Sequence, residues 1–206
     1  MPIEQNLTHY AKRYAQKFSK FIKSPQLFTS LWTCHSSQKP LQERQRVTVV
    51  NVVKTLLSVM EAEHNAIGVC KPDSMEGITH KNLRTRYEKL IGEPITKGRW
   101  FRAIEQLKKA GYLKTKTAWI ATLEDDEQII RSIASKKFFT KKFFCDLALE
   151  QKQDIKKSRS EAIKARRSRG LSNIWKGYKL FNKAKHKVPK LTFDEPPPNA
   201  EFEIPL

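Results

Sequence analysis

The sequence predicts a mainly α-helical protein with a small β-hairpin, in which a winged helix-turn-helix domain is followed by a basic helical extension. Two amphipathic helical segments are separated by a turn of about four residues, as in a helix-turn-helix motif. A stretch rich in Tyr, Thr, Trp and Ile follows the second segment and is interrupted by four acidic residues, which is typical of a hairpin. The third observation is that most of the excess positive charge lies in a later helical stretch.

Composition divides the 206 residues into four expected segments. An N-terminal amphipathic helix or arm covers residues 1–40, and the winged-helix domain covers residues 41–135. The basic helical extension follows over residues 136–187, and an acidic, Pro-rich tail over residues 188–206 is expected to be disordered. Residues 136–190 carry a net charge of +14 out of +19 for the whole chain, so the positive charge is localised and favours a polyanionic partner.

The first expected helix covers residues 9–22 and has Tyr10, Tyr14 and Phe18 on one face, with basic residues on the other. A Ser-Pro pair should end it. Such a helix either packs its aromatic face into a neighbouring core or lies on a nucleic acid or a membrane surface. We expect the packed helix, because an apolar face at helical spacing more often fills a core.

Three helices are expected in the central domain. The first opens at Pro40 and carries a broad apolar stripe, formed by Val49, Val53, Leu56, Leu57 and Met60. The second begins at the potential cap Thr79 and stops at Gly92. The third begins after the potential cap Thr96 and ends at Ala110.

Two strands should follow over residues 112–123 and 128–134, joined by the acidic turn. The order helix, helix and hairpin is what predicts the winged-helix subtype. From Thr140 the pattern returns to helix, with a short apolar segment, a long cationic helix over residues 151–169 and a further helix over residues 172–185.

The helix over residues 97–110 carries the expected functional site. Its apolar residues fall on one side, whereas Arg99, Arg102 and Gln106 share the other side. A major groove admits one α-helix, and Arg on guanine and Gln on adenine are the usual readers of base edges. We therefore expect these three residues to read bases, with Lys97 and Lys109 on phosphates. A merely solvated face is the plainer alternative.

Further contacts to the DNA backbone are expected from the second helix, the hairpin and the basic extension. The residues are Arg84, Arg86, Lys114, Lys116, Lys156, Lys157, Arg159, Lys164, Arg166, Arg167 and Arg169. Neutralising many phosphates releases counterions, so binding should weaken steeply with salt. A basic helix could also be an RNA-binding arm or a target of a calmodulin-like protein.

Features of enzymes are missing from the sequence. It has no Gly-rich phosphate loop, no Gly-Lys-Ser/Thr motif, no His-x-His pair and no HExxH motif. We therefore expect no catalytic activity, no cofactor and no metal site. Three cysteines at unrelated spacings predict no disulfide framework, and neither a signal peptide nor a membrane-spanning run is evident. These observations predict a soluble, cytoplasmic protein.

Two stretches carry a resemblance to a known family. The first is PITKGRWFRAIEQLKKAGYL from Pro94, and the second is KFFTKKFFCDLAL from Lys137, followed by KSRSEAIKARR from Lys157. In this pattern and order the chain resembles the RepA replication initiators of IncFII-type plasmids over about residues 41–185. The chain is shorter than typical members, and its acidic end differs from their basic C-termini.

The resemblance implies binding to double-stranded DNA at a plasmid origin, recruitment of host replication initiation proteins and control of copy number, without enzymatic activity. A winged-helix transcription regulator would show the same physical features and remains an alternative. A less favoured alternative is an RNA-binding or ribosome-associated protein. Neither the origin sequence nor the oligomeric state follows from these residues.

Overall fold

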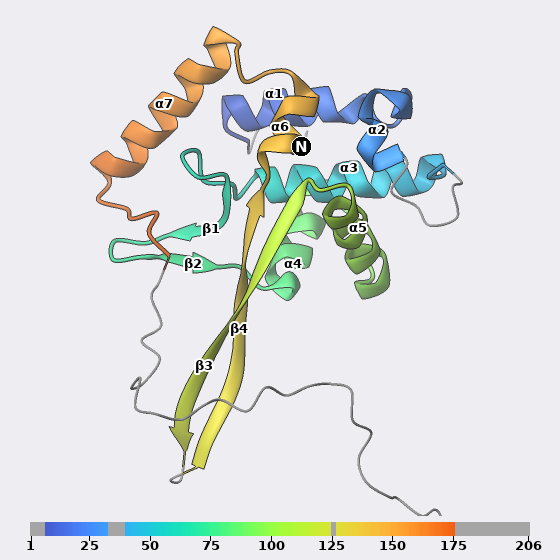
Figure 1. The fold of residues 1–206 in the computed structure, drawn as a ribbon. Coiled ribbons are helices and arrows are strands. Elements are labelled where there is room, and N and C mark those ends of the chain that lie inside the picture. The colour runs from blue at the N-terminus through green and yellow to red at the C-terminus, as the bar shows by residue number, and fades with distance from the viewer. Residues whose placement is uncertain (1–6, 33–39, 125–126, 176–206) are drawn as a thin grey trace, which may run out of the picture.

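The computed structural model describes residues 7–32, 40–124 and 127–175, with side chains for all of these except residues 117–133 (Figure 1). Within these ranges the protein is mixed α/β, with seven α-helices and a small antiparallel sheet of four strands. The hairpin and the helices expected between residues 9 and 169 are present. The expectation of a single hairpin is wrong, because two further strands complete the sheet.

The N-terminal helix packs into the core. Helix α1 spans His9–Ser19 and is followed by the 3-10 turn η2 (Pro25–Phe28) and the short helix α2 (Thr29–Trp32). Tyr10, Tyr14 and Phe18 are at most 2% exposed. The preference for a packed helix over a surface arm is therefore confirmed.

Helix α3 (Glu43–Leu57) is the central support of the molecule. It runs beneath α1, and helices α4 (His80–Ile91) and α5 (Lys97–Lys109) pack on its other side (Figure 1). The predicted boundaries of α4 and α5 are confirmed. The Thr79 and Thr96 hydroxyls each accept a hydrogen bond from a backbone N–H of the first turn, and Gly92 ends α4 in the left-handed conformation with φ at +85°.

The strands pair in the order β2-β1-β4-β3, and all pairs are antiparallel. Strands β3 (Leu113–Glu124) and β4 (Glu127–Phe139) form the long hairpin that projects from the body in Figure 1. The hairpin of β1 (Ala66–Cys70) and β2 (Met75–Gly77) was not predicted. Gly77 lies so close to β4 that a Cβ there would approach the Ala134 carbonyl oxygen to 2.7 Å.

Strand β4 continues five residues beyond its predicted end at Ala134, since Leu113 pairs with Phe139. Lys136 and Lys137 therefore belong to the sheet and not to the helical extension. The extension itself consists of α6 (Lys141–Leu147) and α7 (Gln153–Ser168).

The helix expected over residues 172–185 does not begin where predicted. Ser172 and Trp175 form isolated bridges with Lys71 and Met75 of the β1–β2 hairpin. The rest of this expected helix and the expected tail over residues 188–206 lie outside the described residues.

One hydrophobic cluster includes residues from all of the described helices and from strands β1, β3 and β4. Aromatic rings from distant segments meet in it: Tyr14 of α1 lies 5.0 Å from Phe144 of α6, and Tyr112 lies 5.6 Å from Phe143, between ring centroids. The Thr140 hydroxyl, which caps α6, also donates a 2.6 Å hydrogen bond to the Gly111 carbonyl. The turn after α5 is thus fixed to the start of α6.

Candidate nucleic-acid interface

Helix α5 is held by its apolar side, as its sequence predicts. Trp100, Ala103, Ile104 and Leu107 are at most 4% exposed. The Trp100 indole N–H donates to Nδ1 of His80 at 3.0 Å, which fastens α5 to the first turn of α4. The opposite side of α5 is consequently fixed in direction while it remains open to solvent.

The polar side of α5 has a crest and two flanks. Arg102 and Lys109 lie on the crest, the line along α5 directly opposite Trp100, and both are exposed. Lys97, in the first turn, is exposed as well. The Nε of Arg102 donates to the Gly98 carbonyl at 3.3 Å, one turn earlier. Arg99 and Gln106 are partly buried on the flank that faces α3. The structure therefore brings Arg99, Arg102 and Gln106 together, with Arg102 the most accessible.

A hollow separates this flank of α5 from the first two turns of α3. Its volume is about 230 Å³. The α5 side is formed by Arg99, Arg102 and Gln106, and the α3 side is formed by Gln42, Arg44, Gln45 and Thr48. The sequence reasoning missed the α3 residues, because only the packing of α3 on α5 brings them there. The sequence feature that could have pointed to them is that this helix begins with polar residues, whereas its later turns are apolar.

The other flank of α5 faces the sheet. Phe101 is 40% exposed and lies over His80, with ring centroids 4.9 Å apart. Glu105 pairs with Lys108 at 3.3 Å, so this flank carries little net charge. Burial, with a smaller contribution from Lys137 and Lys108, lowers the pKa of His80 to about 4. The imidazole is therefore neutral near pH 7 and can accept the Trp100 hydrogen bond.

Three lysines of the hairpin lie on the outer face of the sheet. Directly opposite residues of an antiparallel pair share a face. Thr115 is paired with Lys137 on the inner face, whereas Lys116 is paired with Lys136 on the outer one, and Lys114 lies on that face too. Lys114 and Lys116 are exposed, as expected for anion contacts. The like charges of Lys116 and Lys136 face each other, which disfavours the pair unless an anion lies nearby.

Lys137 has an internal position instead. It is 1% exposed, and its ammonium group donates to the carbonyls of Ile78 at 2.8 Å and Ser135 at 3.1 Å. Burial lowers the pKa of Lys137 to about 8. The basic run from Lys136 to Lys142 is therefore not one continuous surface.

The two arginines of α4 differ in their surroundings. Arg84 is partly buried. Arg86 donates from Nε to the Ser58 hydroxyl at 2.7 Å and from Nη2 to the Ser58 carbonyl at 3.3 Å, and burial lowers its pKa. Arg86 thus fastens α4 to the end of α3. It is therefore not available for the expected contact with the DNA backbone.

The cationic residues of α7 divide in the same way. Lys156, Lys157, Lys164 and Arg169 are exposed, as a surface for phosphates requires. Arg159 points inward: its Nε donates to the Ala62 carbonyl at 3.0 Å, and its Nη2 donates to Asn65 Oδ1 at 2.8 Å. Its guanidinium also lies 5.6 Å from the Phe144 ring centroid. Arg159 therefore docks α7 on the core.

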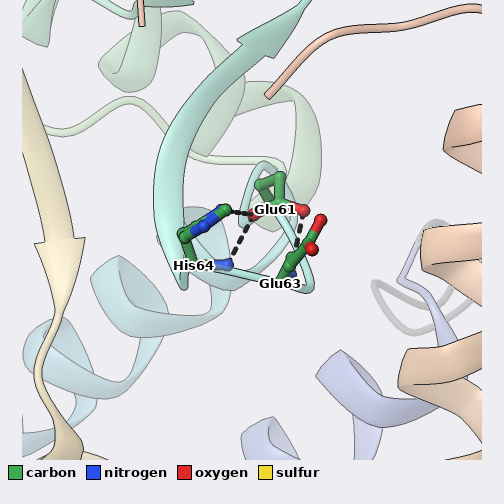
Figure 2. A group of neighbouring side chains, drawn as sticks. All are labelled: Glu61, Glu63 and His64. Carbon is green, nitrogen blue, oxygen red and sulfur yellow. Dashed lines mark hydrogen bonds and ion pairs between the residues drawn. The ribbon is translucent and has the colours of Figure 1, made fainter. Parts of the chain in front are cut away.

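A compact acidic cluster in the loop between α3 and β1 consists of Glu61, Glu63 and His64 (Figure 2). Ligand atoms of these residues lie within 4.8 Å of one another, a spacing that could suit a metal ion. Arg166 from α7, however, pairs with both carboxylates, at 2.8 Å to Glu61. Arg167 pairs with Glu63 at 2.9 Å.

Two guanidinium groups thus balance two carboxylates in this cluster, and a metal ion would have to displace them. The hydrogen bond from Arg166 and the charges of both arginines lower the pKa of Glu63. Arg166 is only 11% exposed and serves as an internal partner, so it is removed from the expected DNA contacts. Arg167 remains 65% exposed.

The exposed cations belong to surfaces that face different ways. Helices α5 and α7 lie on opposite sides of the body, and the outer face of the β3–β4 hairpin is a third surface (Figure 1). The sequence analysis expected all of these cations to contact the bound DNA, without indicating that they face different ways. Among the described residues, no helix is both long and apolar enough to cross a membrane.

Comparison with known proteins finds no matching family, no significantly similar curated protein and no significantly similar solved structure. The assignment of a function therefore rests on the residues, on their geometry and on the sequence resemblance described above.

Proposed function

We propose that the protein is a replication initiator of a plasmid, which binds its origin DNA in a sequence-specific way without being an enzyme. The observation that carries the DNA-binding part is helix α5: its apolar side is buried, its opposite side presents Arg102 and Lys109, and Lys97 is exposed in its first turn. Guanidinium and amide side chains on the exposed side of a firmly held helix are what the major groove requires.

The arrangement of elements supports a winged helix. Helices α4 and α5 are consecutive and share the support of α3, and β3–β4 follows α5 as a long hairpin. Strand β1, which comes between α3 and α4 in the chain, pairs with β4. This order of helices and strands is the one expected of a winged helix, with α5 as the recognition helix and the hairpin as the wing.

In this assignment base reading centres on Arg102, with Arg99 and Gln106 on the adjacent flank. Lys97 and Lys109 at the two ends of α5 contact phosphates. Exposed lysines of the hairpin and of α7 add affinity that does not depend on sequence. Of the hairpin, the exposed Lys114 and Lys116 near its start are the residues that we assign to DNA contact.

The initiation part of the proposal rests on the resemblance to RepA initiators. The two stretches that carry it form α5 with the start of β3, and the end of β4 with α6 and α7. A transcription regulator would bind DNA with the same surface. Recruitment of host replication proteins is what distinguishes an initiator from it.

A minimal replicon tests the proposal. One plasmid carries only this reading frame and its flanking DNA, and a matched plasmid carries an early stop codon in the same frame. The intact plasmid is expected to propagate and the interrupted one to be lost, unless the protein is supplied in trans. Propagation of both plasmids would exclude the initiator. A footprint on the flanking DNA would then favour the regulator, whereas preference for a structured RNA competitor would favour RNA binding.

A further inference from the structure

The hollow between α3 and α5 has walls from two helices and an apolar floor. Val49 and Ala103 form the floor and are 1% and 2% exposed. The walls are polar, and their positions are fixed because both helices are buried along their other sides. The hollow is thus a built feature of the α3–α5 contact.

Within the described residues, the lining of this hollow is positively charged. Arg44 comes from the first turn of α3, and Arg99 and Arg102 come from α5. Of the described residues that line the hollow, none is acidic. The neighbouring carboxylate of Glu43 pairs with Lys23 at 3.2 Å, so it is directed to another partner. Three guanidinium groups around a concave surface concentrate positive potential there.

Guanidinium groups match phosphate oxygens in geometry as well as in charge, since their N–H groups form planar forks. The volume of about 230 Å³ lies below the roughly 300 Å³ at which sites for small molecules begin. A single phosphate therefore suits the hollow better than a whole nucleotide does. The hollow also lies beside Arg102, where a bound duplex would pass.

We propose that this hollow holds one phosphate of the DNA backbone, clamped between Arg44 of α3 and Arg99 of α5. The inference rests on the proposed function and deepens it. The clamp fixes how far α5 enters the major groove. It assigns Arg99 to a phosphate instead of a base, so that Arg102 and Gln106 remain as the residues that read bases. Arg44 is a positioning residue that sequence patterns around the helix-turn-helix do not reveal.

The test uses the full chain and three variants: Arg44→Gln, Arg102→Ala as a base-reading reference, and Lys20→Gln as a control with the same loss of charge on exposed α1-end surface. Duplexes selected from a random library provide the specific site, and a scrambled duplex provides the non-specific one. Affinity is measured by fluorescence anisotropy over a range of salt concentrations. Ethylation interference then maps the phosphates that matter.

Arg44→Gln is expected to weaken binding to both duplexes about tenfold and to lower the salt slope by about one. Interference should disappear at a single phosphate, whereas Lys20→Gln should keep the full pattern. If Arg44→Gln behaves like Lys20→Gln while Arg102→Ala still relaxes specificity, the clamp is wrong and the proposed function stands.

If the wild-type chain selects no duplex, both the clamp and the proposed function are wrong. A separate titration with a mononucleotide and with inorganic phosphate distinguishes the source of the phosphate. Tight, Arg44-dependent binding of the mononucleotide without any change of the salt slope on DNA would assign the hollow to a free ligand and overturn the inference.

Discussion

The roles of individual arginines depend on partners that lie far away in the sequence. Arg159 and Arg166 stand in the same cationic helix as Lys157 and Lys164, yet they are bound to groups 94 to 105 residues earlier in the chain. Composition predicts a basic surface on α7, and it cannot tell which guanidinium groups the fold uses internally. To predict the role of an arginine, one must also know which group of the folded protein it binds.

Replacing Arg166 by Ala should destabilise the fold, because it leaves the nearly buried carboxylate of Glu61 without its cation. The free energy of unfolding should fall by about 3 kcal/mol. Arg167→Ala, at a 65% exposed ion pair, should cost less than about 1 kcal/mol. Urea unfolding followed by circular dichroism measures both. Equal losses for the two variants would contradict the internal role of Arg166.

Arg102 and Lys164 should differ in the kind of binding that they support. Arg102→Ala should cost about 1 to 3 kcal/mol on the preferred duplex and relax the preference at one base pair. Lys164→Ala should weaken all sequences alike and lower the salt slope by about one. Binding to libraries with a single varied base pair, at several salt concentrations, measures both effects. The same profile for the two variants would contradict this division of roles.

At the scale of elements, local signals explain what the sequence could predict. Thr79, Thr96 and Gly92 mark the ends of α4 and α5 by hydrogen bonds and backbone conformations within a few residues. The β1–β2 hairpin lacks such a signal, since it is short and is stabilised by pairing of β1 with β4, about 70 residues later in the chain. The extension of β4 to Phe139 has the same cause.

The junction between α5 and α6 depends on the hydroxyl of Thr140. It donates to the Gly111 carbonyl and accepts from the Phe143 N–H, at 2.6 and 3.4 Å. Thr140→Val keeps the shape and removes both bonds, so unfolding should become easier by about 1 to 2 kcal/mol. Thr85→Val, at an exposed position in α4, should change it by less than about 0.5 kcal/mol. Thermal unfolding compares the pair, and a similar shift in both would show that the junction adds nothing.

At the scale of the whole molecule, the sequence predicted which segments are basic but not which way their surfaces face. The segment that includes α7 is strongly basic, as its composition indicates, but α5 and α7 lie on opposite sides of the body (Figure 1). Under the proposed function, a duplex bound at α5 would therefore have to be long or bent to contact α7 as well. The periodicity of a single helix contains no information about this geometry.

The stability of the whole fold should depend on His80 at mildly acidic pH. Burial lowers the pKa of His80 to about 4, whereas in the unfolded chain it lies near 6.5. Between these values the unfolded chain binds a proton that the folded chain excludes, so stability is fully present above pH 6.5 and is lost as the pH falls toward 4.

His80→Gln offers Trp100 an acceptor and removes this titration. From pH 7 to pH 4.5 the wild-type chain should therefore lose about 2 kcal/mol more than the variant in urea unfolding. The carboxylates, including that of Glu63 with its lowered pKa, titrate in both proteins and cancel in the comparison. Parallel curves for the two proteins would mean that His80 takes up its proton while folded, and the imidazole could then not be the neutral acceptor that holds α5 on α4.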